Sequence, residues 1–210
     1  MRSRRAAYIL FDGVRCVINL FVVVLSLVAI GCAGNPLSYP EEIAAWRAEK
    51  DRFMRGSGES PVPADKRSTF APLPYYPIDE QYRTPAGLKP VGSDQIIELS
   101  LSTGQKRKMR RIGTLGFTLK GQSLSLTAFA DVGDEQLRRL FVPFGDLTSG
   151  TETYQGGRYL DLDRTSSGVY DLDFNRAYHP FCVFDSSYEC PIPPRENRMK
   201  VPIRAGEKLP

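Results

Sequence analysis

The feature that most restricts the fold is a series of short segments, between residues 94 and 174, in which apolar and polar residues alternate. Alternation with a period of two is typical of strands that bury one face. Turn sequences such as Lys120-Gly121 separate the segments, and no helical pattern comes between them. Strands joined in this way pair as antiparallel neighbours, so we predict a mainly β fold, a small antiparallel barrel or sandwich of about six to eight strands. The clearest segments are residues 97–101, 112–119, 124–128, 140–144, 159–163 and 169–174.

A basic run lies between the first two predicted strands and comprises Lys106-Arg107-Lys108, Arg110 and Arg111. We interpret it as a solvated strand or sheet edge, because exposed charges discourage pairing with another sheet. Contact with phospholipid or another polyanion is the alternative.

One amphipathic helix is predicted at residues 40–55, ahead of the β region. Glu41 and Glu42 fall in its first turn, where the helix dipole favours anions, and Trp46 lies on its apolar face. The following segment, to residue 93, is rich in Pro and Tyr. We expect it to pack on the surface in extended form, since a disordered linker rarely carries so many aromatic residues.

Residues 1–31 have the features of a secretory signal, with four Arg followed by an apolar stretch at residues 16–31. At roughly 16 residues, this stretch is shorter than the ~20 that a membrane-spanning helix needs. Val28-Ala29-Ile30-Gly31-Cys32 resembles the lipobox of bacterial lipoproteins, in which the cysteine is acylated, with palmitate among its chains, and becomes the first residue. We therefore predict lipidation of Cys32; an uncleaved anchor, with Cys32 incidental, is the alternative.

This resemblance implies a mature protein held in the bacterial cell envelope by its lipid. Two or three acyl chains make membrane attachment effectively permanent. Ala33, in place of Asp, implies sorting to the periplasmic face of the outer membrane. We divide the mature chain into residues 32–93, which form a tether, the helix and the wrapping segment, and a β domain at residues 94–210 with a Cys/Pro-rich tail.

The charge of the predicted mature chain is close to neutral. The whole sequence has 28 basic and 24 acidic side chains, and residues 1–31 account for four Arg and one Asp, which leaves 24 and 23. A balanced chain lacks the positive field that nucleic-acid binding requires. We therefore predict no nucleic-acid partner.

Three stretches of the second half resemble the bacterial family known as domain of unknown function 1684. The resemblance covers most of the mature chain and implies a β-rich domain, frequently behind a lipoprotein signal, with no established reaction or ligand. His179 stands where the resemblance leads us to expect Asn, so it implies no histidine chemistry. The stretches run from Phe141-Val142-Pro143-Phe144-Gly145-Asp146 to Gly157-Arg158-Tyr159-Leu160-Asp161, from Asp173-Phe174-Asn175 to Tyr178, and from Cys190-Pro191-Ile192-Pro193-Pro194 to Arg198.

Cys182 and Cys190 are the thiols that remain once the signal is removed and Cys32 is lipidated. An even pair in an oxidising compartment predicts a disulfide. Free thiols are one alternative, and a zinc site with His179 is another. No second Cys-x-x-Cys or further His supports the metal, so we predict neither a metal nor another cofactor.

Two groups of polar residues are candidates for ligand binding. In the first, Asp146 would accept a hydrogen bond, Thr148 or Tyr154 would supply a hydroxyl and Arg158 would clamp an anion. The second group is Asp173, Asn175 and Arg176, at the end of a predicted strand. The alternative for both is structural: a turn closed by side chains in the first and an ion pair in the second.

The sequence contains no recognisable catalytic constellation, nucleotide fingerprint or haem motif. The main functional hypothesis is a non-catalytic module that binds a small anionic or polar ligand or an envelope partner. A hydrolase or lyase with an Asp/Tyr/Arg site and a purely structural lipoprotein are the alternatives, so whether the protein is an enzyme stays open.

Overall fold

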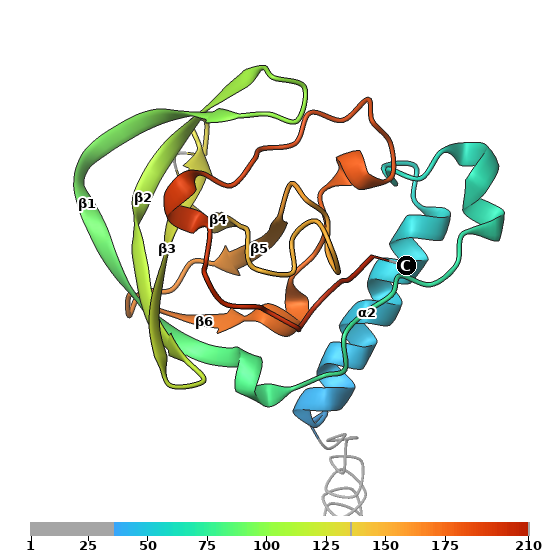
Figure 1. Ribbon diagram of the computed structural model, residues 1–210, viewed down its shortest axis with the longest axis horizontal. Helices are drawn as coiled ribbons and strands as arrows, with labels where there is room; N and C mark the ends of the chain where they lie inside the picture. Colours follow the sequence, from blue (N-terminus) through green and yellow to red (C-terminus); the bar gives the residue numbers. More distant parts are fainter. Residues whose placement is uncertain (1–35, 135, 210) are drawn as a thin grey trace, which may run out of the picture. The chain divides into compact units, whose positions relative to one another are not determined.

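The computed structural model describes residues 36–134 and 136–209. The predicted signal and Cys32 therefore lie outside the described residues. Within them, one six-stranded antiparallel sheet dominates, with the strand order β5-β4-β3-β2-β1-β6, and it curls into a nearly closed barrel (Figure 1). The predicted mainly β fold is confirmed. The strands are β1 (Arg83–Ser100), β2 (Lys106–Leu119), β3 (Gln122–Asp131), β4 (Arg139–Phe144), β5 (Arg158–Asp163) and β6 (Val169–Asp173).

The predicted turn at Lys120-Gly121 is confirmed. Lys120 and Gly121, at φ 48° and 79°, form the two-residue turn between β2 and β3. Positive φ at both positions is the requirement of the turn type that matches the twist of a hairpin. The pairing continues from this turn as Leu119 opposite Gln122 and Leu115 opposite Leu126.

The first strand begins at Arg83, well before the start that we predicted at residue 94. Two prolines hide it in the sequence, because proline lacks the N–H that a strand donates. Pro85 lies one residue before the pairing with β2 begins at Ala86, and Pro90 lies at the register shift between Pro90 and Gln95. Pro90 thus lies where the ladder with β2 is interrupted, and Pro85 lies outside that ladder, although it pairs with Asp171 of β6.

The barrel closes through the chain after β6 instead of through β6 itself. Tyr159 of β5 and Tyr178 exchange backbone hydrogen bonds, with N···O distances of 2.9 and 3.1 Å. On the opposite side, β3 and β4 pair only at Phe129 and Phe141. The tail therefore completes the wall of the barrel next to β5.

The helix α2 (Tyr39–Gly56) confirms the predicted amphipathic helix, and its Ile43 and Met54 are fully buried. Met54 packs with Val62 and Leu73 of the wrapping segment, which includes the short helices η1 (Ala64–Thr69) and η2 (Glu80–Tyr82). The segment is thus packed, as predicted. Among the described residues, no helix is long and apolar enough to cross a membrane.

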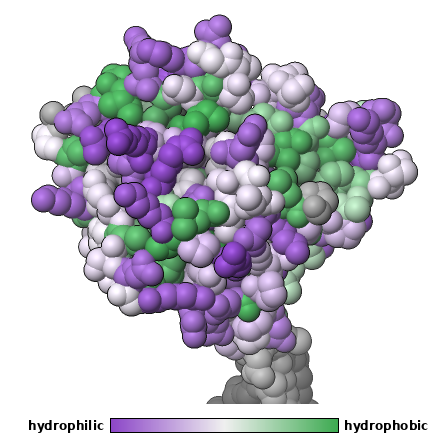
Figure 2. Space-filling view, in the orientation of Figure 1, coloured by the Kyte–Doolittle hydropathy of each residue, from purple (hydrophilic) through white to green (hydrophobic). Residues whose placement is uncertain are grey.

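The barrel interior forms the largest core, and the tail contributes to it. Leu115, Leu126 and Leu160 from the strands pack with Phe174 and Ile203 from the tail. The tail contains the short helices η3 (Phe174–Arg176), η4 (Phe181–Val183) and η5 (Arg195–Asn197). On the face drawn in Figure 2, hydrophilic and hydrophobic residues are interspersed.

Candidate functional site

A hollow of about 380 Å³ opens on the outer face of β4 and β5, beside the seam where the tail closes the barrel. The strand alternation explains its lining. Leu140, Leu160 and Leu162 face the core, so Phe141 and Asp161, which are paired with each other, face outward. We call this hollow the Asp161 pocket, after the residue at its centre; its walls include Arg139, Phe141, Tyr159, Asp161, Tyr178 and Phe181.

Asp161 and Tyr178 form the polar centre of the pocket. The Tyr178 hydroxyl donates to Asp161 Oδ2 at 2.9 Å. Asp161 is exposed at the mouth of the pocket, yet the protein atoms around its carboxylate exclude part of the water that would stabilise the charged form. Burial therefore raises the pKa of Asp161, although the Tyr178 hydrogen bond acts in the opposite direction. Burial also raises the pKa of Tyr178, so this hydroxyl is a donor at neutral pH.

Aromatic rings surround this polar centre. The centroids of Phe141 and Tyr159 are 4.7 Å apart, those of Tyr159 and Tyr178 are 5.7 Å apart, and both pairs meet edge to face. Tyr159 is fixed further because its hydroxyl donates to the Pro191 carbonyl at 2.6 Å. Edge-to-face packing in these pairs holds the ring orientations, so the pocket is pre-formed.

A second hollow of about 540 Å³ adjoins the first and shares Arg139, Asp161 and Tyr178 with it. We call it the Trp46 hollow, because α2 contributes the single Trp of the chain to its wall. Trp46 was predicted to lie on the apolar face of its helix. Here it is half-buried, with the Arg176 guanidinium 5.8 Å from the centroid of its ring.

Three residues of the first predicted group, Asp146, Thr148 and Arg158, come together, but inside the protein. Tyr154 is half-buried and stays outside this network, with its hydroxyl 3.9 Å from Cys182 Sγ. Arg158 is 0% exposed and its Nη2 donates to Asp146 Oδ2 at 3.0 Å. Its remaining terminal donors bind the carbonyls of Ile203, Ala205 and Glu207. The Arg158 guanidinium thus ties the tail to β5 and offers no atom to a ligand in solvent.

Thr148 belongs to the same internal network. Its hydroxyl donates to Asp146 Oδ1 at 2.6 Å, and its backbone N–H donates to the same oxygen at 2.7 Å. Both residues are buried. This is the turn closed by side chains that we gave as the structural alternative.

The second predicted group lies elsewhere, at the start of α2. Asn175 is fully buried and donates to the Tyr39 hydroxyl at 2.8 Å and to Asp173 Oδ1 at 3.1 Å. Arg176 forms an ion pair with Glu42 of the helix. These contacts dock α2 on the barrel, and Arg176 also lines the Trp46 hollow.

His179 is buried between Tyr154 and Glu207. Its Nε2 accepts a hydrogen bond from the Tyr154 backbone N–H at 3.3 Å, and its backbone N–H donates to Glu207 Oε2 at 2.7 Å. Burial, together with the charges of Arg158 and Lys50, lowers the pKa of His179 to about 3. The imidazole is therefore neutral at physiological pH.

This pKa predicts a loss of stability in acid. In the unfolded state, His179 binds a proton as the pH falls below its ordinary pKa near 6.5, whereas in the folded state it does so only near pH 3. The contribution of neutral His179 to the free energy of unfolding is therefore fully present above pH 6.5. It falls as the pH decreases, by about 2 kcal/mol between pH 7 and pH 5. His179→Asn, whose amide oxygen can accept from Tyr154, should flatten the pH dependence measured by urea unfolding at these two pH values. Equal slopes in both proteins would contradict this assignment.

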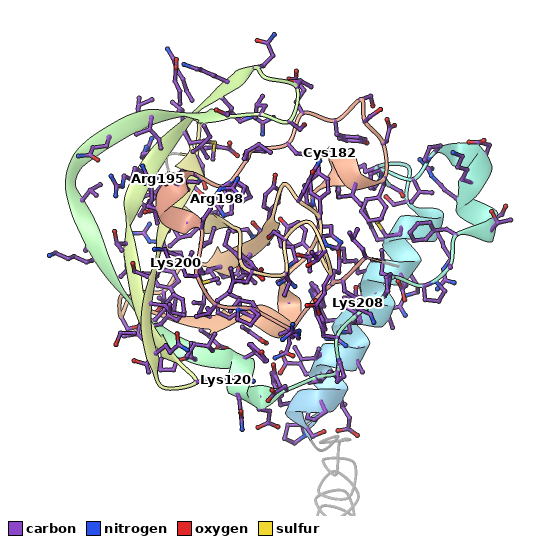
Figure 3. The ribbon with its side chains drawn as sticks, in the orientation of Figure 1. Lys120, Cys182, Arg195, Arg198, Lys200 and Lys208 are labelled. Carbon is purple, nitrogen blue, oxygen red and sulfur yellow. The ribbon has the colours of Figure 1, made fainter. Side chains whose placement is uncertain are left out.

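Cys182 and Cys190 are free thiols in the structure, and the Cys182 backbone N–H donates to Cys190 Sγ at 3.1 Å. Cys182 lies on η4, in the loop that ends at Cys190 (Figure 3). Burial, and to a smaller extent the hydrogen bond with the Cys182 side chain, raises the pKa of Cys190 to about 12. This thiol is therefore not a reactive thiolate. The disulfide stays a prediction.

If the exported protein carries this disulfide, reduction should destabilise it. Closing a loop of about nine residues contributes roughly 2 to 3 kcal/mol on the chain-entropy account. We expect dithiothreitol to lower the midpoint of urea unfolding for the exported protein and to leave Cys190→Ser unchanged. Two titratable thiols in the denatured, unreduced protein would contradict the prediction.

No group of three or more His, Cys, Asp or Glu side chains in the described part of the chain is arranged to hold a metal ion. His179, Cys182 and Cys190 do not form such a group. The Asp161 pocket combines a polar centre with aromatic walls, which are features typical of small-molecule sites.

Sequence reasoning did not select Asp161 or Tyr178, although both lie in the stretches that carry the family resemblance. The alternation of β5 does place Asp161 on the solvent side of the strand. What the sequence could not give is the pairing of Tyr178 with β5, which brings its hydroxyl to this carboxylate.

Fold and site together define a small, nearly closed antiparallel β barrel with one N-terminal helix and an outward-facing pocket of carboxylate and aromatic groups. The chain belongs to the family described as protein of unknown function (DUF1684), whose model matches residues 68–208. This confirms the resemblance found in the sequence.

The chain is also similar to a solved structure, the solution NMR structure of the uncharacterised protein from gene locus rrnAC0354 of Haloarcula marismortui. The two chains are 38% identical, with a TM-score of 0.64, and the match covers 80% of this chain and 93% of the other. Among curated proteins, none matches this sequence.

Proposed function

We propose that this protein is a lipid-anchored envelope module that binds a small polar ligand in the Asp161 pocket and does not transform it. The observation that carries the proposal is a solvent-open carboxylate, held by the Tyr178 hydroxyl, at the centre of a pre-formed aromatic hollow of about 380 Å³. Small-molecule sites are typically hollows of ~300–1,000 Å³ with apolar walls and a few fixed polar groups. The pocket has these properties.

The raised pKa of Asp161 supports a binding role. A carboxylate that is difficult to charge costs stability above its folded-state pKa, and this cost is relieved as the pH falls through that value. Perturbed pKa values of this kind cluster at functional sites. Arg158, in contrast, gives no support to an anionic ligand, since its guanidinium is sealed inside the protein.

Membrane attachment through Cys32 is part of the proposal and has its own test. In Cys32→Ser, we expect the protein to move from the membrane fraction to the soluble fraction and to lose incorporation of labelled palmitate. Cys16→Ser serves as the control, because this residue lies in the predicted signal and should change neither readout. Membrane retention of Cys32→Ser would favour the uncleaved anchor.

Ligand binding can be tested without knowing the ligand. A library of neutral, cationic and anionic fragments is titrated into the full chain in neutral detergent micelles, and backbone amide shifts are followed by NMR. We expect the shifted amides to cluster at residues 139–141, 159–161 and 178–181. Perturbation confined to other surfaces, or none at all, would overturn the proposal and favour a structural role; conversion of a fragment would favour an enzyme.

Asp161→Asn should remove the charge at the centre of the pocket while keeping the fold. Its amide oxygen can still accept the Tyr178 hydrogen bond, so we expect the fold to be kept and the free energy of unfolding at pH 7 to stay equal or rise by up to ~1 kcal/mol, a value discounted for solvent screening. Fragment binding should weaken. Asp65→Asn, which removes one exposed carboxylate on η1, is the control and should bind as the wild type does.

A further inference from the structure

We infer that the ligand is a linear aliphatic polyamine, held in the Asp161 pocket by carboxylates and ring faces and extending into the Trp46 hollow. This inference rests on the proposed function and specifies its ligand class. Three features of the two hollows carry it: their charge, their rings and their continuity.

The Asp161 pocket has an excess of negative charge. Four carboxylates line it, from Asp131, Asp134, Asp161 and Glu189, against the two guanidinium groups of Arg107 and Arg139. None of the four forms an ion pair within the described part of the chain. Neutral groups donate to them instead, such as the Tyr178 hydroxyl to Asp161 and the Thr103 hydroxyl to Glu189.

The two guanidinium groups have partners of their own, although the positive charge of Arg139 also acts on the nearby Asp161 carboxylate. Arg139 Nε lies 3.5 Å from Asp163 Oδ1, and Arg107 Nη2 donates to the Glu189 carbonyl at 3.4 Å. The pocket therefore has carboxylates available for a cation and no comparable set of free donors for an anion. Charge complementarity favours a cationic ligand.

The aromatic walls suit an ammonium group joined to methylene groups. Tyr178 already makes such a contact within the protein: Lys50 Nζ, which is ion-paired with Glu207, lies 4.3 Å from the centroid of its ring. An ammonium over a ring face gains from the electron density of the ring, and the gain is larger where water is partly excluded. Methylene groups pack on the remaining apolar lining, which includes Phe181 and Met109.

The two hollows share Asp161, Tyr178 and Arg139, so a ligand can occupy both. The Trp46 hollow also has rings, from Trp46 and Tyr170, but its carboxylates Glu42 and Asp163 are ion-paired with Arg176 and Arg139. No three of these acidic groups converge as a metal site would require. Spaced ammonium groups on a chain match negative charges distributed along a groove, which is why we commit to a linear polyamine.

The test is a titration of the full chain, in neutral detergent micelles, with spermidine, followed by Trp46 fluorescence and by isothermal titration calorimetry. Trp46 is the single Trp and lines the second hollow, so it reports occupancy directly. We expect saturable binding, with weaker binding of the shorter putrescine. Loss of a hydrogen-bonded charge partner should weaken spermidine binding at least about tenfold in Asp161→Asn.

Asp65→Asn, with the same change in net charge at a distant site, should leave spermidine affinity unchanged. N-acetylglucosamine and inorganic phosphate are the neutral and anionic probes, and magnesium chloride at matched ionic strength controls for general charge screening. Saturable binding of the sugar or of phosphate at Asp161, without spermidine binding, would overturn the ligand class and leave the proposed pocket standing. Equal spermidine affinity in Asp161→Asn and the wild type would also overturn it, and failure of every fragment would overturn the pocket itself.

Discussion

Replacing Arg158 with alanine should lower the free energy of unfolding by about 3 to 5 kcal/mol, enough to leave much of the protein unfolded. The change removes the hydrogen bonds that Arg158 donates to the carbonyls of Ile203 and Ala205. It also leaves the buried Asp146 carboxylate without its cation. The main cost comes from that uncompensated buried charge. Urea unfolding followed by Trp46 fluorescence measures the loss.

Asp146→Asn in the Arg158→Ala background separates the charge from the carbonyl contacts. The double variant should recover part of the stability, because the buried charge is gone. Arg83→Ala is the matched surface control: Arg83 binds Asp171 through two nitrogens but is exposed, so we expect a loss of about 1 kcal/mol or less. A similar small loss in Arg158→Ala would show that the guanidinium is solvated after all, and its role as an anion clamp would be open again.

Replacing Asn197 with alanine should cost about 3 kcal/mol or more, a large effect for one neutral side chain. The fully buried Asn197 amide accepts from the Thr127 N–H at 2.7 Å and donates to the carbonyls of Thr127 and Pro143 at 2.8 and 2.7 Å. It thereby bridges β3 and β4, which pair with each other at a single position. Alanine would leave three backbone groups buried without partners.

Glu196→Ala tests the specificity of this effect, because Glu196 lies next to Asn197 on η5 but is exposed. We expect a change within about 0.5 kcal/mol for this control, measured by the same unfolding experiment. Arg195 and Arg198 lie on and just after this short helix (Figure 3), so the control also keeps the local basic surface intact. If both variants unfold at the same urea concentration, Asn197 does not hold the gap between the strands.

The two networks matter for function because they position the tail, and the tail builds the pocket. Arg158 holds residues 203–207, and Glu207 in turn binds the backbone of His179. His179 follows Tyr178, whose hydroxyl contacts Asp161. The residues first predicted to bind a ligand therefore support the seam beside which the Asp161 pocket opens.

Much of the fold could be predicted because its signals are local. Alternation and turn chemistry located all six strands, and the apolar face with its two first-turn glutamates located α2. The early start of β1 was missed because Pro85 and Pro90 are read as strand breakers. Pro85 lies outside the pairing with β2, and Pro90 lies where that pairing shifts register, and local sequence contains neither fact.

The site could be predicted only in part, because its residues meet through long-range pairing. The sequence identified Asp146, Arg158, Asp173 and Asn175 as polar residues with a specific role, but the same residue types serve a binding site and an internal network equally well. Burial separates the two, and burial is a property of the packed tail.

The sequence by itself determined the class of the fold, the order of its elements along the chain and several polar residues of the internal networks, since periodicity and turn chemistry act between near neighbours in the chain. The tertiary structure decided which of these residues are sealed and which face solvent. It did so because the tail, joining β5 at Tyr178, buries Arg158 on one side of the barrel wall and places a hydroxyl beside Asp161 on the other.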